Sequence, residues 1–117
     1  MDFSAFFLFL NSVKTFHWLT SSHAHHIVLD EAYNNFSDKI DEFVESAIGM
    51  NNPSEFKPVK VSFMEAATED ELPYLFEKIY DDFISQIRKY ATTQALESLI
   101  DDMDNIANKT IYLLRMN

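Results

Sequence analysis

The scarcity of chain breakers is the feature that most limits what this sequence can fold into. Glycine occurs once and proline three times in 117 residues. Both residue types interrupt helices and mark tight turns, so a turn-rich β fold would need many more of them. Apolar residues instead recur at steps of three and four, which is the repeat of a helix with one buried stripe. The sequence therefore predicts an all-α fold built from long helices.

The apolar pattern predicts four helices in one domain, residues 1–117. The first spans about residues 3–18 and the second about 23–48, followed by the only glycine, Gly49. The third spans about residues 68–91, and the fourth spans about residues 92–117. Four helices with a longer connection between the second and the third predict a ferritin-like four-helix bundle.

Each predicted helix has an apolar face and a polar face. A threonine followed by acidic residues is expected to cap the start of the third helix. Residues 50–66 contain two prolines and are expected to form the longer connection, with room for a short extra turn. The residues expected to face the core are Phe3, Phe6, Phe7, Leu10 and Val13, then Leu29, Ala32, Tyr33, Phe36, Ile40, Phe43, Val44 and Ala47, then Leu75, Phe76, Ile79, Phe83 and Ile87, then Leu96, Leu99, Ile100, Met103, Ile106 and Ile111.

Composition excludes several classes of function. The chain has no cysteine, so disulfides and thiolate metal sites are absent, and a metal site must use histidine, carboxylate or backbone oxygen. A formal charge of −10 disfavours binding to nucleic acid. The apolar start of the chain is too short to span a membrane and carries Asp2 where a signal peptide has basic residues. We expect a soluble, cytoplasmic protein without a nucleic-acid or membrane partner.

Two pairs of potential metal ligands lie on the second predicted helix. His26 and Asp30 are spaced i,i+4, and so are Asp41 and Glu45. At 100° per residue all four fall within a stripe of about 100° beside the apolar face. The pairs are about 22 Å apart along the helix, so one metal ion cannot bind both. If two copies of this helix pack antiparallel about a two-fold axis, the His26 and Asp30 pair of each copy meets the Asp41 and Glu45 pair of the other copy. Two equivalent sites result.

A further histidine, His17, falls inside the apolar stripe of the first predicted helix. A buried imidazole needs a hydrogen-bond partner or a metal, and the start of the second helix is close enough in sequence to provide one. Simpler interpretations also fit these residues. Asp41 and Glu45 are typical of a solvated acidic face, a lone histidine is more often a core residue with a partner, and His23 and His25 are expected to be exposed.

Three short segments resemble a known family. Lys14 to Trp18 read "KTFHW", His26 to Asp30 read "HIVLD", and "DEFVE" follows from Asp41 to Glu45. In these segments, and more loosely in the last helix, the chain resembles the Dps branch of the ferritin-like superfamily, the miniferritins. The resemblance implies ferroxidase ligands at His17, His26, Asp30, Asp41 and Glu45, shared between two-fold related subunits that oxidise Fe(II).

The resemblance also implies a homo-oligomer, at least a dimer, while the family's twelve-subunit iron-storage shell is left open for this small chain. Zn or Mn are alternatives to Fe in the same site. The connection after "KTFHW" is shorter than the family's, which leaves His25 and His23 as alternatives to His26. The family's basic DNA-binding extension is missing, so DNA protection is not expected. The alternative function is a catalytically inactive helical dimer that serves as a structural or interaction module.

Overall fold

The computed structural model of the chain describes residues 2–51 and 68–116. These contain four α-helices and no strand: α1 (Ser4–Leu19), α2 (His23–Asn51), α3 (Leu72–Ile87) and α4 (Gln94–Leu114). Two short 3-10 turns, η1 (Glu69–Glu71) and η2 (Arg88–Tyr90), flank α3. The prediction of an all-α four-helix bundle is confirmed. None of the helices in the described ranges is both long and apolar enough to cross a membrane.

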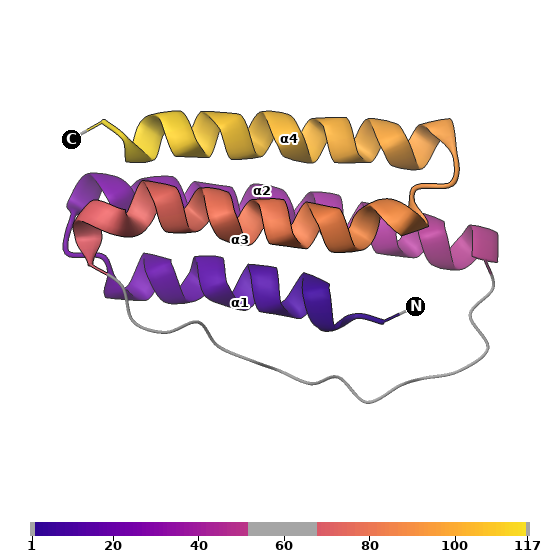
Figure 1. The fold of residues 1–117 in the computed structure, drawn as a ribbon, viewed down its shortest axis with the longest axis horizontal. Helices are drawn as coiled ribbons and strands as arrows, with labels where there is room; N and C mark the ends of the chain where they lie inside the picture. The colour runs from indigo at the N-terminus through magenta and orange to yellow at the C-terminus, as the bar shows by residue number, and fades with distance from the viewer. Residues whose placement is uncertain (1, 52–67, 117) are drawn as a thin grey trace.

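The four helices lie side by side in a bundle with extents of 44 × 28 × 19 Å. α2 packs against α1 and α4, and α3 packs against the same two helices. Figure 1 shows that α2 and α3 run in one direction and that α1 and α4 run in the other, so each helix is antiparallel to both of its main neighbours. Bundles in which the second and third helices run the same way have one long connection between them, as ferritin-like folds do. Residues 52–67, between these helices, lie outside the described residues.

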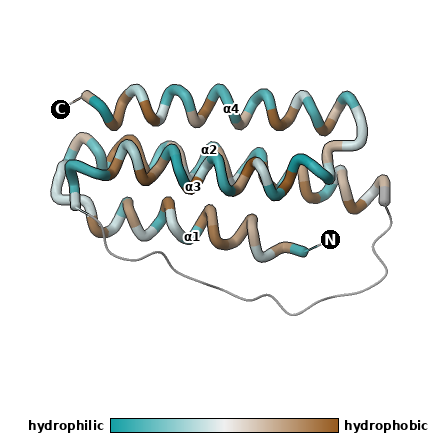
Figure 2. Tube along the Cα trace, viewed as in Figure 1, coloured by the Kyte–Doolittle hydropathy of each residue, from teal (hydrophilic) through white to brown (hydrophobic). Residues whose placement is uncertain are grey.

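The core of the bundle is rich in aromatic side chains. Figure 2 shows apolar and polar residues alternating along each helix, which is the pattern of amphipathic helices that share one core. Phe9 lies at the centre, stacked on Phe83 with ring centroids 4.5 Å apart and edge-on to Phe36 at 4.8 Å. The buried Tyr80 keeps its hydroxyl satisfied by donating a hydrogen bond of 2.6 Å to Asp104. The described part of the core therefore provides packing and contains no cluster of metal ligands.

The stripe predicted for α1 is correct at Phe6, Leu10 and Val13, which are buried or packed against the core, and wrong at Phe7. Phe7 was expected inside, but 45% of its surface is exposed, whereas Phe9, absent from the predicted stripe, is 1% exposed. Positions 5–10 of α1 are all apolar, so periodicity alone cannot choose between adjacent faces of this helix. On α2 the predicted face is correct, with its residues buried or packed against the core.

The helix boundaries differ from the prediction at three places. α2 continues through Gly49 to Asn51, so the glycine does not end it. Thr68 makes no side-chain capping bond, and its acidic neighbours form η1 before α3 begins. α3 ends at Ile87, and η2 follows where the helix was expected to continue. The extra turn predicted within residues 50–66 falls on residues that the structure does not describe beyond Asn51.

Candidate functional site

His17 and His26 lie against each other where α1 turns into α2. Their rings stack with centroids 3.8 Å apart and planes inclined by 24°. The Nδ1 atom of His17 is 2.8 Å from the carbonyl oxygen of His26, and the Nδ1 atom of His26 is 2.8 Å from the carbonyl oxygen of His17. His17 is buried, as its place in the apolar stripe predicted, and it has the partner that a buried imidazole needs.

These two reciprocal contacts define which tautomer each neutral ring adopts. A carbonyl oxygen can only accept a hydrogen bond, so each Nδ1 must carry the hydrogen. In the neutral imidazole the Nε2 atom then has the free lone pair, which is the atom that binds a metal. Histidines that ligate metals commonly donate their other ring N–H to a backbone carbonyl in this way. The pair is therefore prepared, in both tautomer and orientation, to offer two Nε2 atoms.

The same contacts have a purely structural role as well. The carbonyl of His17 is in the last turn of α1, where it has no partner within the helix. The His26 side chain donates a hydrogen bond to this carbonyl and so caps the C-terminal end of α1. This bond ties the start of α2 to the end of α1, and it would be needed even in a protein that binds no metal.

The predicted ligand Asp30 approaches His17 but does not contact it closely. Asp30 Oδ1 is 3.9 Å from His17 Nε2, and about half of the aspartate side chain is exposed. Within residues 2–51 and 68–116, no three histidine or carboxylate side chains converge closely enough to hold a metal ion. One chain thus brings His17, His26 and Asp30 to the same region and does not complete a site from them.

Asp41 and Glu45 lie farther along α2, with exposed side chains. At 1.5 Å per residue this pair lies about 22 Å along α2 from the pair of His26 and Asp30, as the sequence predicted. Other acidic residues of α2 behave as ordinary surface groups: Glu31 pairs with Lys109 at 3.6 Å, and Glu42 pairs with Lys39 at 3.7 Å.

Beside the histidine pair, the outer surface of α1 is aromatic and carries one cation. Lys14 Nζ lies 4.7 Å from the ring centroid of Tyr33 and 5.8 Å from that of Trp18. Trp18 is 69% exposed. Phe7 lies on the same side of the helix, about two turns before Lys14 and about three turns before Trp18. An apolar helix with a single charge is normally covered on all sides, so this surface is suited to contact with another protein.

Sequence reasoning placed His25 wrongly. It was expected to be exposed, but it is 5% exposed. It belongs to the first turn of α2, and Figure 1 shows that α2 and α3 begin and α4 ends at the same end of the bundle. His25 Nδ1 is 2.6 Å from Glu69 Oε1, and its Nε2 is 3.3 Å from the carbonyl oxygen of Met116. Because His25 faces Glu69, it does not replace His26 in the histidine pair. Its partner is 44 residues away in sequence, and nothing local in the sequence indicates this contact.

Glu69 is the most highly connected carboxylate in this region. Its Oε1 accepts a hydrogen bond of 2.5 Å from the Thr20 hydroxyl in addition to that from His25, and its Oε2 accepts one of 3.3 Å from the Ser21 amide. Burial by itself would raise the pKa of Glu69, but the hydrogen bonds from Thr20, His25 and Ser21 outweigh burial and hold this pKa below its usual value of 4.5.

This lowered pKa predicts a specific acid sensitivity. The unfolded chain takes up a proton at Glu69 at a higher pH than the folded chain, so the stabilisation is present above pH 4.5 and is lost as the pH falls through the lowered pKa. We expect Glu69→Gln to reduce the free energy of unfolding by about 1 kcal/mol at pH 7. The difference from the wild type should shrink below pH 4.5.

Urea unfolding followed by circular dichroism at several pH values measures this difference. The control is Glu77→Gln, which removes a surface ion pair with Arg115 at the same end of the bundle. It should change the free energy of unfolding by less than about 1 kcal/mol. A Glu69→Gln deficit that does not change between pH 7 and pH 3 would contradict the prediction.

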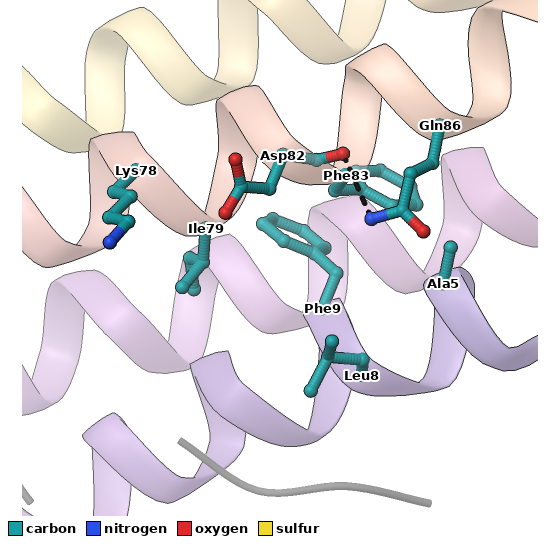
Figure 3. A pocket seen from close by; sticks show the side chains of 8 residues that line it. All are labelled: Ala5, Leu8, Phe9, Lys78, Ile79, Asp82, Phe83 and Gln86. Carbon is teal, nitrogen blue, oxygen red and sulfur yellow. Dashed lines mark hydrogen bonds between the residues drawn. The ribbon is translucent and has the colours of Figure 1, made fainter. Parts of the chain in front are cut away.

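A separate hollow of about 200 Å³ lies between α1 and α3 (Figure 3). Its floor is apolar and includes Phe9 and Phe83, and Lys78, Asp82 and Gln86 line its α3 side. Gln86 is held by donating a hydrogen bond of 3.1 Å to the carbonyl oxygen of Asp82. The hollow contains a single carboxylate and no histidine, so its chemistry differs from that of the histidine pair.

Comparison with known proteins identifies a family for this chain. Comparison with curated proteins gives no match, and comparison with solved structures gives none either. Residues 17–114 match the model of a family of unknown function, DUF5856. The matched range covers well over half of the chain, contains α2, α3 and α4, and begins at His17. The chain is therefore a member of the DUF5856 family.

Proposed function

We propose that this protein binds Fe(II) and oxidises it at a site that two copies of the chain complete across a two-fold axis, as in the Dps-like miniferritins. The observation that carries the proposal is the reciprocal hydrogen bonding of His17 and His26. It leaves an unprotonated Nε2 on each ring, with Asp30 beside His17. Neutral imidazoles and carboxylates without thiolates suit Fe(II), and they also suit Zn and Mn.

The second chain is needed because one chain does not assemble the full ligand set. Asp41 and Glu45 are too far from the histidine pair along α2 to join it within one chain. In an antiparallel pair of α2 helices, these carboxylates lie beside the histidine pair of the partner, and each dimer has two equivalent sites. The exposed aromatic surface of α1, with Phe7 and Trp18, supports an interface on this side of the bundle.

The chemistry proposed for the site is simple. Carboxylates from both chains hold Fe(II), and the neutral imidazoles complete its coordination. Two Fe(II) ions each give up one electron, and one hydrogen peroxide molecule accepts both and forms two hydroxide ions. If dioxygen replaces peroxide, it takes up the two electrons together with two protons from water and leaves as hydrogen peroxide. The oxidant is a co-substrate, so the protein contributes binding and orientation. Storage of the ferric product would require a larger shell of subunits.

The test is the rate of Fe(II) oxidation, with the native mass and metal content of the same sample. We expect the wild-type protein to be at least a dimer, to bind iron, and to oxidise Fe(II) in the presence of peroxide faster than a variant with His17→Ala and Glu45→Ala. If the two proteins oxidise Fe(II) at the same rate, the proposal fails. Metal analysis of protein purified without added metal distinguishes Fe from Zn and Mn.

One observation favours a second candidate, an inactive helical dimer that serves as a structural or interaction module. No three potential ligands converge within the described residues of a single chain, and the histidine pair already has a structural role in closing α1. This candidate predicts a dimer that does not accelerate iron oxidation, whether it holds a static metal or none.

A further inference from the structure

A second cluster of polar side chains surrounds the turn that joins the two paired histidines. This turn consists of Thr20, Ser21 and Ser22, and it connects the end of α1 to the start of α2. It has internal hydrogen bonds, with the Ser22 amide donating to the Thr20 hydroxyl at 3.2 Å and the His25 amide donating to the Ser22 hydroxyl at 3.2 Å. Glu69, from η1, anchors this turn from outside the first two helices by accepting hydrogen bonds from Thr20 and Ser21.

The contacts of Glu69 reach both ends of the turn. Thr20 and Ser21 bind it directly after α1, and His25 binds it within the first turn of α2. His25 immediately precedes His26, so holding the His25 ring also limits rotation of the first turn of α2 about its axis. The Met116 carbonyl, on the other side of the His25 ring, restricts that ring further.

We propose that Glu69 is a positioning residue for the His17–His26 pair, acting through Thr20, Ser21 and His25. The pair depends on two bonds of 2.8 Å that must form together, and such bonds weaken steeply with misalignment. Without Glu69, the turn loses its anchor to η1 and His25 loses its carboxylate, so the first turn of α2 can shift relative to α1. The consequence for metal binding rests on the proposed function, whereas the geometry of the pair is a property of the metal-free chain.

The experiment measures the imidazole nitrogens of metal-free protein by ¹⁵N NMR at a fixed pH. In the wild type, His17 and His26 should both show a protonated Nδ1 and an unprotonated Nε2. In Glu69→Ala both rings should move towards the averaged signals of a free histidine. Glu69→Gln should restore the wild-type signals in large part, because its amide oxygen can still accept from Thr20 and His25, which both bind Oε1 in the wild type. Asp70→Asn, which changes the adjacent carboxylate of η1, should leave them unchanged.

Thr20→Val is the second variant if Glu69→Ala does not fold. It keeps the side-chain shape and removes the hydrogen bond to Glu69, together with the one that the hydroxyl accepts from the Ser22 amide. It should shift the signals of His17 and His26 in the same direction by a smaller amount. Wild-type signals of His17 and His26 in a folded Glu69→Ala or Thr20→Val protein would overturn the proposal, even if the melting temperature falls. Shifts in Asp70→Asn as large as those in Glu69→Ala would overturn it too.

Metal binding is a separate measurement on the same variants. If the proposed function is correct, Glu69→Ala should weaken Fe(II) binding about tenfold, as the loss of outer contacts does at other metal sites. If the wild type binds no Fe(II), the proposed function fails, and the NMR result still decides whether Glu69 positions the pair.

Discussion

Two variants that are each unable to oxidise Fe(II) should regain activity when they assemble together. The first carries His17→Ala and Asp30→Ala, and the second carries Asp41→Ala and Glu45→Ala. Each homodimer lacks half of every proposed site, so we expect each to lose about 10–100-fold or more of the wild-type rate. In a heterodimer, the intact histidine half of one chain meets the intact carboxylate half of the other. One of its two sites is then complete.

The size of the recovery follows from random assortment. Half of the dimers formed from equal amounts of the two chains are heterodimers, and half of their sites are intact, so about a quarter of the wild-type rate should return. The chains are co-expressed with different tags, and native mass spectrometry measures the fraction of heterodimer. Peroxide-dependent oxidation of Fe(II) is then followed by absorbance.

A matched control removes two other acidic side chains of α2. Glu31 and Glu42 form surface ion pairs with lysines and lie outside the proposed site. The variant with Glu31→Ala and Glu42→Ala should keep the wild-type rate, which separates loss of ligands from loss of negative charge. If heterodimers form and activity does not return, the site is not shared between two chains.

The fold could be predicted from the sequence because its signals are local. Few glycines and prolines, together with repeats of three and four, are sufficient to indicate four helices and the face of α2 that packs inward. Where the sequence is apolar on every side, as in α1, the local signal cannot choose a face. Exposed and buried positions are then decided by α2 and α3, which pack against this helix.

The candidate site could be predicted only in part. The motifs around His17 and His26 indicated that these residues would lie together, and the structure places their rings in contact. The contact of His25 with Glu69 could not be predicted, because it joins segments 44 residues apart and Glu69 is one of nineteen acidic residues in the chain. The meeting of Asp41 and Glu45 with a histidine pair depends on a second chain and stays a prediction.

The largest loss of stability is expected from Phe9→Ala. Phe9 is 1% exposed and contacts aromatic rings of both α2 and α3. Its removal leaves a cavity at the centre of the bundle and ends these ring contacts. Substitutions of this kind cost about 3–5 kcal/mol, which is a large part of the total stability of a domain of this size. Urea unfolding followed by circular dichroism measures the loss.

Phe7→Ala is the matched control, because it removes the same side chain two residues away on the same helix. At 45% exposure in the single chain, Phe7 contributes little to the core, and the change should cost less than about 1 kcal/mol at low protein concentration. If Phe7 lies in a dimer interface, its cost should increase with protein concentration, since association stabilises the folded chain by mass action. The cost of Phe9→Ala should be large at every concentration. Equal losses of stability for the two variants in dilute protein would mean that α1 packs with a different face inward. The burial of His17, on the same helix, would then be contradicted as well.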